Sequence, residues 1–539
     1  MNPLRTAVHA GRGAKALADA GILTPRVDRI AQKVVALRAY GPVPAAGLVA
    51  AARSYPDRPY VIDEQGTLTF SDVDARTNAI VRGLMAAGIR EGDPVGVLCR
   101  NGRAFVEAML ACSKLGATIL FLNTDFAGPQ LADVLEREGG KGLISDAEFD
   151  RLLPDDAYPE RRWIGFDDGE PTDTPTLTDL IDAHPGAPVR APHGTGRLVI
   201  LTSGTTGTPK GASRTGAPLA SVVGILDRLP FRAGQVHHVV APLFHGWGLL
   251  NFTLGLTLPS TVVLRRRFDP EETLKVIAEH GVHSAAMVPT MLQRIMQLPP
   301  ETLARYDTSS LQAIPLSGSA IPGDLATRAM DALGDVVYNF YGSTETGWAS
   351  IATPKDLRAA PGTAGRPPLG TDVVLLDAYD RPVAQGETGR IFVASQLRMD
   401  GYTDHELAKA MVDGKMSTGD VGHFDEGGRL FVSGRDDEMI VSGGENVFPR
   451  EVEDLLSSHP EVAEAAVIGV RDDEFGQRLL AFVALEDGAT VDAVALRDHV
   501  KAHLARYKVP RDVLVVDELP RNPTGKVLKR ELYSRAAAV

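Results

Sequence analysis

From Tyr60 to about residue 200, the spacing of hydrophobic positions switches between that of a strand and that of a helix. Residues 95–99 and 118–122 are short runs of apolar and small side chains, which predict buried strands. Residues 105–115 lie between them and carry apolar side chains at helical spacing. Further strand-like runs are expected at residues 239–243, 261–264 and 284–289. Strands that alternate with helices in this way predict layered α/β structure.

The pattern changes twice toward the C-terminus. Between residues 370 and 394, short strand-like runs separated by turns predict a small β-rich subdomain. Beyond the charged, glycine-containing segment 434–437, strand-like runs alternate with helical patterns such as residues 452–456 and 496–504. A chain of 539 residues is too long for one hydrophobic core. We therefore expect an α/β protein whose large N-terminal domain has layered α/β subdomains and a small β-rich subdomain. A small α+β domain follows it.

Composition excludes several classes of protein. The net charge is −13, which argues against a general nucleic-acid binder, because such proteins present a basic surface. With Cys99 and Cys112 as the two cysteines, a disulfide framework is not expected and the cytoplasm is the natural compartment. Cys112 shares a helical face with Phe105 and Met109, so we interpret it as a core thiol.

The N-terminal forty residues are rich in alanine and in basic side chains. They lack the apolar segment of a secretory signal, and no apolar run in the chain reaches the length of a transmembrane helix. We expect this extension to form a helix docked on the protein surface. Peripheral contact with a membrane is left open, because a basic amphipathic helix can also lie on one.

A run of small and hydroxylated residues is the first candidate for chemistry. It follows the apolar residues 198–200 and ends in Pro209-Lys210-Gly211. Glycines let backbone N–H groups converge on an anion, hydroxyls add donors and the lysine adds positive charge. The run is not a P-loop of the NTPase type, because a proline precedes the lysine and a glycine follows it. The candidate phosphate-binding residues are Thr202, Ser203, Gly204, Thr205, Thr206, Gly207 and Lys210.

Four more motifs follow in order: Tyr341-Gly342-Ser343-Thr344-Glu345, Ser417-Thr418-Gly419-Asp420, Gly434-Arg435-Asp436-Asp437 and Pro523-Thr524-Gly525-Lys526. An aromatic face suits a purine, a hydroxyl suits a phosphate oxygen and a carboxylate suits magnesium. Together with the phosphate loop, these motifs resemble those of the adenylate-forming superfamily. That superfamily contains acyl-CoA synthetases, carrier-protein adenylation domains and luciferases. The resemblance extends from about residue 50 to the end of the chain.

The resemblance implies a site for ATP and Mg²⁺. The phosphate loop would hold the β- and γ-phosphates, Tyr341 would stack on adenine and Thr344 would contact the α-phosphate. Glu345 would hold Mg²⁺, Asp420 would bind the ribose hydroxyls and Arg435 would assist there. Further residues expected to line the nucleotide are Ser317, Gly318, Ser319, Asn339 and Gly342.

The same resemblance implies a two-step ligase with a mobile C-terminal domain. Lys526 would promote adenylation of the acid, and Asp437 would be the hinge about which the small domain turns. Gly443 and Gly444 would then line a tunnel for the thiol, and Arg471 and Lys508 would contact coenzyme A. The expected segments are a helical extension at 1–45, an AMP-binding domain at 46–434, a hinge at 435–437 and a mobile domain at 438–539.

The acid is expected to lie near His245, which matches a histidine that flanks the substrate carboxylate. Trp247 and Val288 are candidates for the acyl pocket, with the tryptophan acting as a gate or as a wall. The candidate lining lacks a lysine or arginine for a second carboxylate, so we favour a medium- or long-chain fatty acid and a fatty acid–CoA ligase. An aryl acid–CoA ligase, an enzyme that loads a carrier protein and a non-catalytic nucleotide sensor are the alternatives. A homodimer is left open.

Overall fold

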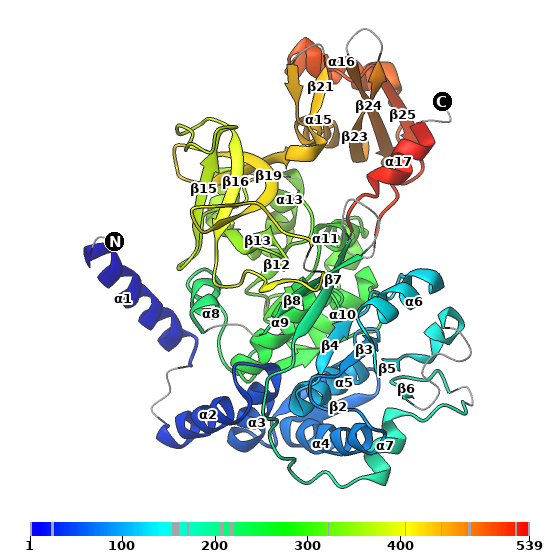
Figure 1. The fold of residues 1–539 in the computed structure, drawn as a ribbon. Coiled ribbons are helices and arrows are strands. Elements are labelled where there is room, and N and C mark those ends of the chain that lie inside the picture. Colours follow the sequence, from blue (N-terminus) through cyan, green and yellow to red (C-terminus); the bar gives the residue numbers. More distant parts are fainter. Residues whose placement is uncertain are drawn as a thin grey trace.

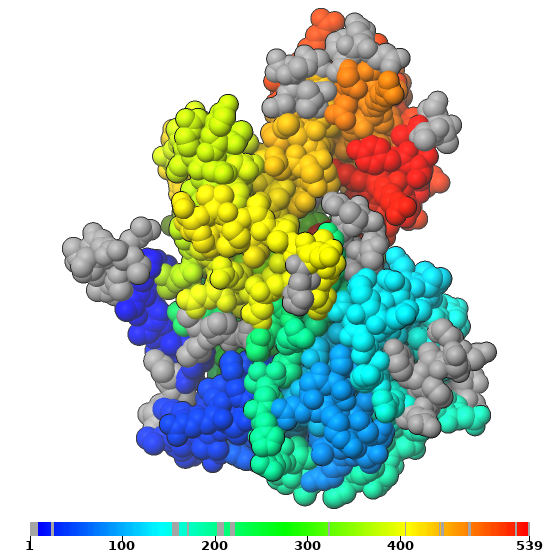
Figure 2. Space-filling model, viewed as in Figure 1, coloured from blue at the N-terminus to red at the C-terminus, as the bar shows by residue number. Residues whose placement is uncertain are grey.

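The computed structural model describes residues 3–22, 26–153, 161–169, 172–203, 209–215, 219–321, 323–404, 406–442, 445–472, 476–522 and 525–536. These residues form a large N-terminal domain and a smaller C-terminal lobe that stands beside it (Figures 1 and 2). The predicted α/β class, with a β-rich subdomain and a terminal α+β domain, is confirmed. No helix in these ranges is long and apolar enough to span a membrane.

A seven-stranded sheet forms the centre of the first α/β subdomain. Its order is β17 (Gly401–Tyr402), β8 (Pro209–Arg214), β7 (Leu198–Ser203), β4 (Thr118–Phe121), β3 (Pro94–Leu98), β5 (Gly142–Ser145) and β6 (Arg162–Ile164). The strands from β7 to β6 are parallel, whereas β8 and β17 run antiparallel to their neighbours. Loops at the carboxyl ends of β3, β4, β5 and β7 therefore lie along one edge.

Two further sheets complete the α/β part of the large domain. One contains β11 (Ser284–Ala286), β9 (Val236–Val239), β10 (Thr261–Val263), β1 (Pro59–Asp63) and β2 (Gly66–Thr69). The other contains β12 (Ile314–Leu316), β13 (Val337–Ser343) and β14 (Gly347–Ala352). Isolated parallel bridges between Ser284 and Ala313 and between Met287 and Leu316 join the two sheets.

The β-rich subdomain and the C-terminal lobe each have a five-stranded sheet. The first contains β15 (Asp372–Leu376), β16 (Gly389–Ala394), β19 (Lys415–Phe424), β18 (Met411–Val412) and β20 (Leu430–Arg435). The second contains β22 (Glu445–Val447), β21 (Ile440–Ser442), β24 (Gly476–Leu485), β23 (Val462–Asp472) and β25 (Asp512–Val516). A short 3₁₀ turn, η2 (Asp436–Glu438), connects them.

Helices cover these sheets. In the large domain they are α1 (Pro3–Asp19), α2 (Val27–Tyr40), α3 (Pro44–Ser54), α4 (Phe70–Ala86), α5 (Arg103–Leu115), α6 (Gly128–Arg137), α7 (Leu177–Ala183), α8 (Leu219–Leu226), α9 (Gly246–Thr257), α10 (Pro270–His280), α11 (Pro289–Met296), α12 (Pro300–Leu303), α13 (Gly323–Leu333) and α14 (Pro354–Ala359). In the lobe they are α15 (Pro449–Ser457), α16 (Ala493–His503) and α17 (Lys529–Ala536). Short 3₁₀ helices are η1 (Ala147–Leu152) and η3 (Arg506–Lys508).

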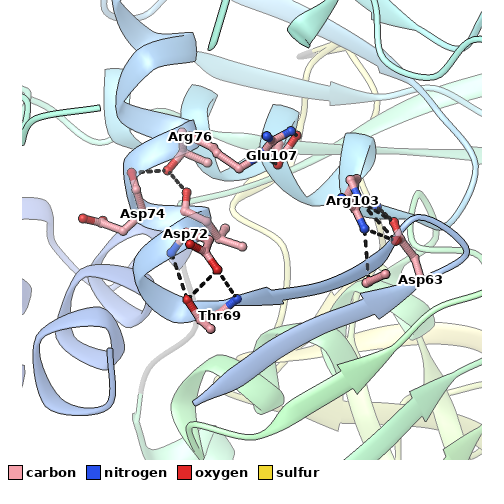
Figure 3. A network of polar contacts seen from close by, with 10 residues as sticks. Asp63, Thr69, Asp72, Asp74, Arg76, Arg103 and Glu107 are labelled. Carbon is pink, nitrogen blue, oxygen red and sulfur yellow. Dashed lines mark hydrogen bonds and ion pairs between the residues drawn. The ribbon is translucent and has the colours of Figure 1, made fainter. Parts of the chain in front are cut away.

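Buried ion pairs connect helix α5 to strand β1 and to helix α4, as Figure 3 shows. The Arg103 guanidinium donates to Asp63 Oδ1 at 2.5 Å, and the Arg103 amide donates to Asp63 Oδ2 at 2.9 Å. One turn further on, Arg76 of α4 donates to Glu107 at 2.5 Å. Because Asp63 ends β1, these contacts fix α5, and the loop before it, against the second sheet.

The strand predicted at residues 239–243 is misplaced. The strand in the structure, β9, ends at Val239, and the following residues leave the sheet. The buried side chain of Asn101 donates to the carbonyls of Val239 and Ala241 at 3.2 and 3.0 Å, in place of strand partners. Pro242 has no backbone N–H to continue the ladder. His237, in the middle of β9, is polar and disguised the strand in the sequence.

Two buried histidines predict a loss of stability in acid. Burial lowers the pKa of His237 and of His238 to about 4, so both are neutral in the folded protein at neutral pH. Below about pH 6.5 the unfolded chain binds protons that the folded chain does not, so stability falls as the pH falls toward 4. His237→Phe should reduce this loss by about 2–3 kcal/mol, because the His237 ring packs edge-on against Phe231 and its buried Nε2 has no hydrogen-bond partner to lose.

Calorimetry of the full chain at about pH 7 and about pH 4.5 tests this expectation. The thermal midpoint of His237→Phe should drop less than that of the wild-type protein. The exposed His503→Gln serves as the control and should behave as the wild-type protein does. An equal drop in all three proteins would show that His237 does not take part in acid unfolding.

Candidate active site

The five motifs come together between the large domain and the lobe. The candidate phosphate loop connects β7 to its antiparallel partner β8, and Thr202 pairs with Lys210 across this hairpin. Gly204, Thr205, Thr206 and Gly207 lie outside the described residues, as do the side chains of Thr202 and Ser203. The hairpin nevertheless places the loop at the carboxyl end of a parallel strand, where α/β proteins commonly bind ligands.

Tyr341 and Asp420 form the nucleoside end of the site. The Tyr341 hydroxyl donates to Asp420 Oδ2 at 2.6 Å, and Arg435 Nη1 lies 3.5 Å from the other carboxylate oxygen. Burial raises the pKa of Asp420, while the hydrogen bond from Tyr341 and the nearby cations oppose the rise. Gly419 has a φ of +83°, and a side chain there would meet Arg435 at 2.9 Å. An aromatic ring and a carboxylate held together in this way suit a base and its ribose.

The other predicted nucleotide residues lie on the neighbouring sheet. Ser317, Gly318 and Ser319 follow β12, beside Asn339 and Gly342 of β13. The Ser317 hydroxyl donates to the Phe340 carbonyl at 3.0 Å, and Asn339 Nδ2 donates to the Thr363 carbonyl at 3.1 Å. Both side chains are buried, so in this structure they hold the backbone in place and do not point toward the nucleotide site.

Thr344 and Glu345 lie at the turn between β13 and β14. Arg214 of β8 donates to the Thr344 carbonyl at 2.9 Å, which links this turn to the phosphate-loop hairpin. A side chain at Gly246 would lie 3.7 Å from Thr344 Oγ1, so this hydroxyl faces the start of α9. Tyr402 donates to Glu345 Oε1 at 3.1 Å.

The donor set around Glu345 fits a magnesium ion that is bound with a nucleotide. The described residues contain no group of three or more His, Cys, Asp or Glu side chains placed for a metal. Magnesium commonly takes only one or two carboxylates, together with phosphate oxygens and water. A single carboxylate near the predicted phosphate site meets that requirement.

His245 stands immediately before α9. Protein atoms surround its imidazole, although part of its surface stays accessible. This burial, helped by the positive charge of Lys526, lowers the pKa of His245 to about 3. The imidazole is therefore neutral at physiological pH and can donate or accept a hydrogen bond.

Asn101 is a positioning residue that the sequence did not reveal. Its carboxamide donates to the carbonyls of Val239 and Ala241 and accepts from the Leu243 amide at 2.8 Å. It thereby fixes the turn that leads to His245. No sequence signal marked it, because its partners lie about 140 residues away along the chain. Asn101 lies between β3 and α5, in the loop that the Asp63–Arg103 pair holds in place.

The Lys526 side chain reaches this region from the C-terminal lobe and is exposed. Its charge lowers the pKa of His245 and opposes the raised pKa of Asp420, so its ammonium lies within electrostatic range of both. The preceding Gly525 has a φ of +76° and presses against Thr290 of α11, where a side chain would meet Oγ1 at 2.5 Å. Figure 1 shows this C-terminal segment descending from the lobe to the large domain.

The predicted hinge is held on both sides by ion pairs. Arg435, which ends β20, binds Asp437 at 3.0 Å, and Asp437 is exposed as expected for a pivot. The next residue, Glu438, binds Lys529 at the start of α17 at 2.7 Å. The Arg435 contact ties the segment to the large domain, and the Lys529 contact ties it to the lobe. The pivot itself stays a prediction.

Trp247 is packed among other aromatic rings. Its indole N–H donates to the Met287 carbonyl at 3.0 Å, and its ring lies 4.9 Å from Phe340 and 5.5 Å from Trp348. Val288 is buried in the same apolar cluster. Of the two roles left open by the sequence, these contacts favour a fixed wall over a gate.

The residues predicted to bind the thiol belong to the C-terminal lobe. Gly443 and Gly444, between β21 and β22, lie outside the described residues. Lys508 binds Glu451 through both carboxylate oxygens at 2.7 Å, and Arg471 lies near the end of β23. The contacts with coenzyme A therefore stay predictions.

Comparisons with known proteins agree with this geometry. Residues 48–403 match the model of the AMP-binding enzyme family, and residues 451–526 match the AMP-binding enzyme C-terminal domain. A fatty acid–[acyl-carrier-protein] ligase, ScoC, from Streptomyces coeruleorubidus is 31% identical over 90% of this chain and 94% of its own. An indoleacetate–CoA ligase from Aromatoleum aromaticum is 34% identical over 87% and 94%. The solved structure of the anthranilate CoA ligase AuaEII with anthranoyl-AMP superposes with a TM-score of 0.82 at 26% identity, covering 92% of this chain and 98% of that one.

The chain belongs to the AMP-binding enzyme family, which confirms the resemblance seen in its motifs. It is accordingly an enzyme of the AMP-forming acid–thiol ligase class.

We expect Asn101→Asp to slow acid-dependent adenylation about ten- to a hundredfold. A carboxylate cannot donate to the two carbonyls, and each buried hydrogen bond that is lost costs about 1–3 kcal/mol. Pyrophosphate release should show the effect in the kcat and KM for the acid, with little change in the KM for ATP. Asn78→Asp is the matched control, since Asn78 is equally buried in α4. A general loss of stability without this kinetic split would contradict a positioning role.

The lowered pKa of His245 gives a second expectation. His245→Gln should be slower than the wild-type protein but should show the same pH dependence of kcat/KM for the acid between about pH 5.5 and 8. The reason is that the imidazole of the free enzyme does not change charge in this range. Loss of an inflection near pH 6.5 in the variant would mean that His245 titrates there.

Proposed function

We propose that the protein uses ATP to convert a carboxylic acid into an acyl-adenylate and then into an acyl-CoA. The observation that carries this proposal is that the Lys526 ammonium, which comes from the lobe, lies within electrostatic range of His245 and Asp420 of the large domain. The lobe orientation that places it there fits the first of the two steps.

In that step a carboxylate oxygen attacks the α-phosphorus of ATP, and the bond to pyrophosphate breaks. Negative charge grows on the phosphate oxygens, and Lys526 offsets it in a site that is partly shielded from water. Thr344 is placed to bind a phosphate oxygen, and neutral His245 is placed to bind the substrate carboxylate. Bound Mg²⁺, held by Glu345 and the phosphates, would neutralise part of the triphosphate charge.

The second step requires Lys526 to move away from the substrate and a thiol to take its place. Rotation about residues 435–437 would break the Arg435–Asp437 pair and keep the Lys529–Glu438 pair, because the latter lies within the moving part. The thiolate would attack the acyl carbonyl, and AMP would leave with its phosphate. Coenzyme A is the proposed thiol, and the indoleacetate and anthranilate ligases support it by their names.

For the acid, we propose a compact apolar acid, with an aromatic acid as the first choice. The support is the fixed wall of Trp247, Phe340 and Trp348 beyond His245, and the aryl acids named in two of the relatives. A medium- or long-chain fatty acid is the second candidate, favoured by the relative that acts on a fatty acid. That relative also makes a carrier protein the alternative acceptor.

Pyrophosphate release over a panel of aryl acids and fatty acids of increasing chain length, with and without coenzyme A, tests acid and acceptor together. Trp247→Phe should widen the range of acids accepted, because it should change the discrimination between two competing acids by about 1–3 kcal/mol. Fatty acids that react best in the wild-type protein would overturn the aryl assignment. ADP and phosphate as products would overturn the whole proposal.

Lys526→Ala should separate the two half-reactions. Loss of a charge-stabilising group from such a site slows its step about a hundred- to a thousandfold, so formation of acyl-AMP should fall by that factor. Conversion of supplied acyl-AMP to acyl-CoA should continue, because the lysine is proposed to have withdrawn by then. Lys501→Ala, on an exposed face of the same lobe, is the control. Equal losses in both half-reactions would show that this lysine does not act in the first step alone.

A further inference from the structure

Helix α2 presents an unpartnered apolar face to solvent. One side of the helix packs inward through Ala36 and Tyr40, which belong to a small core with α3. The opposite side carries aliphatic side chains that are between 41% and 75% exposed: Val27, Ile30, Val34, Val35 and Leu37. Of the twelve large hydrophobic side chains that are exposed in the described parts of the chain, these five lie on this one helix.

Helical spacing brings four of the five side chains onto one surface. Positions 27, 30, 34 and 37 follow one another at intervals of three or four residues, which places them along a single stripe. Figure 1 shows α2 on the outside of the large domain, and Figure 2 shows the same region as open surface. Scattered exposed hydrophobic residues need no explanation, but a contiguous patch marks a contact surface.

The charge around the patch is positive, in contrast to the rest of the protein. Residues 1–45 contain seven lysines and arginines against two aspartates, although the net charge of the chain is −13. Arg38, which is exposed, stands at the C-terminal end of the stripe, and Arg26, at the other end, is paired with Asp28 at 2.8 Å. Arg29 lies at its side, with its guanidinium 4.2 Å from the Tyr55 ring.

We propose that this face of α2 binds an anionic lipid surface. Aliphatic side chains on one face of a helix, bordered by arginines, are the arrangement with which amphipathic helices lie in the boundary between lipid headgroups and acyl chains. The acidic remainder of the protein would be repelled by such a surface, so the basic extension is the part suited to meet it. Pairing of two copies through this face is less favourable, because it would bring the two basic surfaces together. The proposal does not depend on which acid the enzyme activates.

Sedimentation of the full-length protein with extruded vesicles tests the proposal. One set contains phosphatidylcholine alone, and the other contains phosphatidylcholine with about a third of phosphatidylglycerol. We expect at least fivefold more protein to pellet with the anionic vesicles at low salt, and less at high salt, because salt screens the arginines. Val34→Glu/Leu37→Glu should lose this binding, and Arg38→Gln should weaken it.

Val494→Glu is the matched control, because Val494 is 63% exposed on α16 of the C-terminal lobe. It should bind vesicles as the wild-type protein does, and all variants should keep their activity and thermal midpoint. The proposal fails if the wild-type protein does not bind anionic vesicles, or if Val34→Glu/Leu37→Glu binds them equally well. It also fails if ultracentrifugation without lipid reveals a dimer that only this double variant loses, since the face would then join two copies.

Discussion

The site depends on one contact between the two parts of the molecule, the seating of the Lys526 loop on α11. Gly525 takes up a left-handed conformation against Thr290, and Gln293 of α11 donates to the Ala463 carbonyl of the lobe at 2.9 Å. The Arg521 guanidinium closes the loop from behind by donating to the Gly525 carbonyl and pairing with Glu464 at 3.0 Å. Because the lysine comes from the lobe and the other groups predicted to act in adenylation come from the large domain, the orientation of the lobe decides whether that site is complete.

Electrostatics at this contact follow from burial. A histidine held neutral by its surroundings does not repel a nearby lysine, and His245 is held neutral within electrostatic range of Lys526. Neutrality in turn requires that the turn before α9 stays closely packed, which Asn101 ensures from the end of β3. The ion pairs of α5 hold that end of β3 in place, so contacts that never touch the substrate set the charge state of a residue that is proposed to bind it.

The sequence predicted the parts of this arrangement that are local. Apolar periodicity located the helix at α5 and the strands at β3 and β4, and the motifs placed Tyr341 and Asp420 in one site, where the structure joins them by a hydrogen bond. It could not predict Asn101, since a side chain that replaces strand partners far along the chain leaves no periodic signal. The strand at residues 239–243 was misplaced for the same reason, and also because His237 and His238 give β9 a polar sequence. The sequence likewise could not predict the hydrogen bond that fixes Trp247, because the same residues could encode either a buried, fixed indole or a mobile one.

The lobe orientation in this structure is proposed to serve adenylation and must change before a thioester can form. Gln293→Cys/Ala463→Cys, joined by a short reducible linker, tests this directly, and Cys99 and Cys112 are buried and out of reach. The linked protein should still form acyl-AMP and pyrophosphate but make no acyl-CoA, and reduction of the linker should restore the second step. Acyl-CoA formed at the normal rate by the linked protein would contradict it.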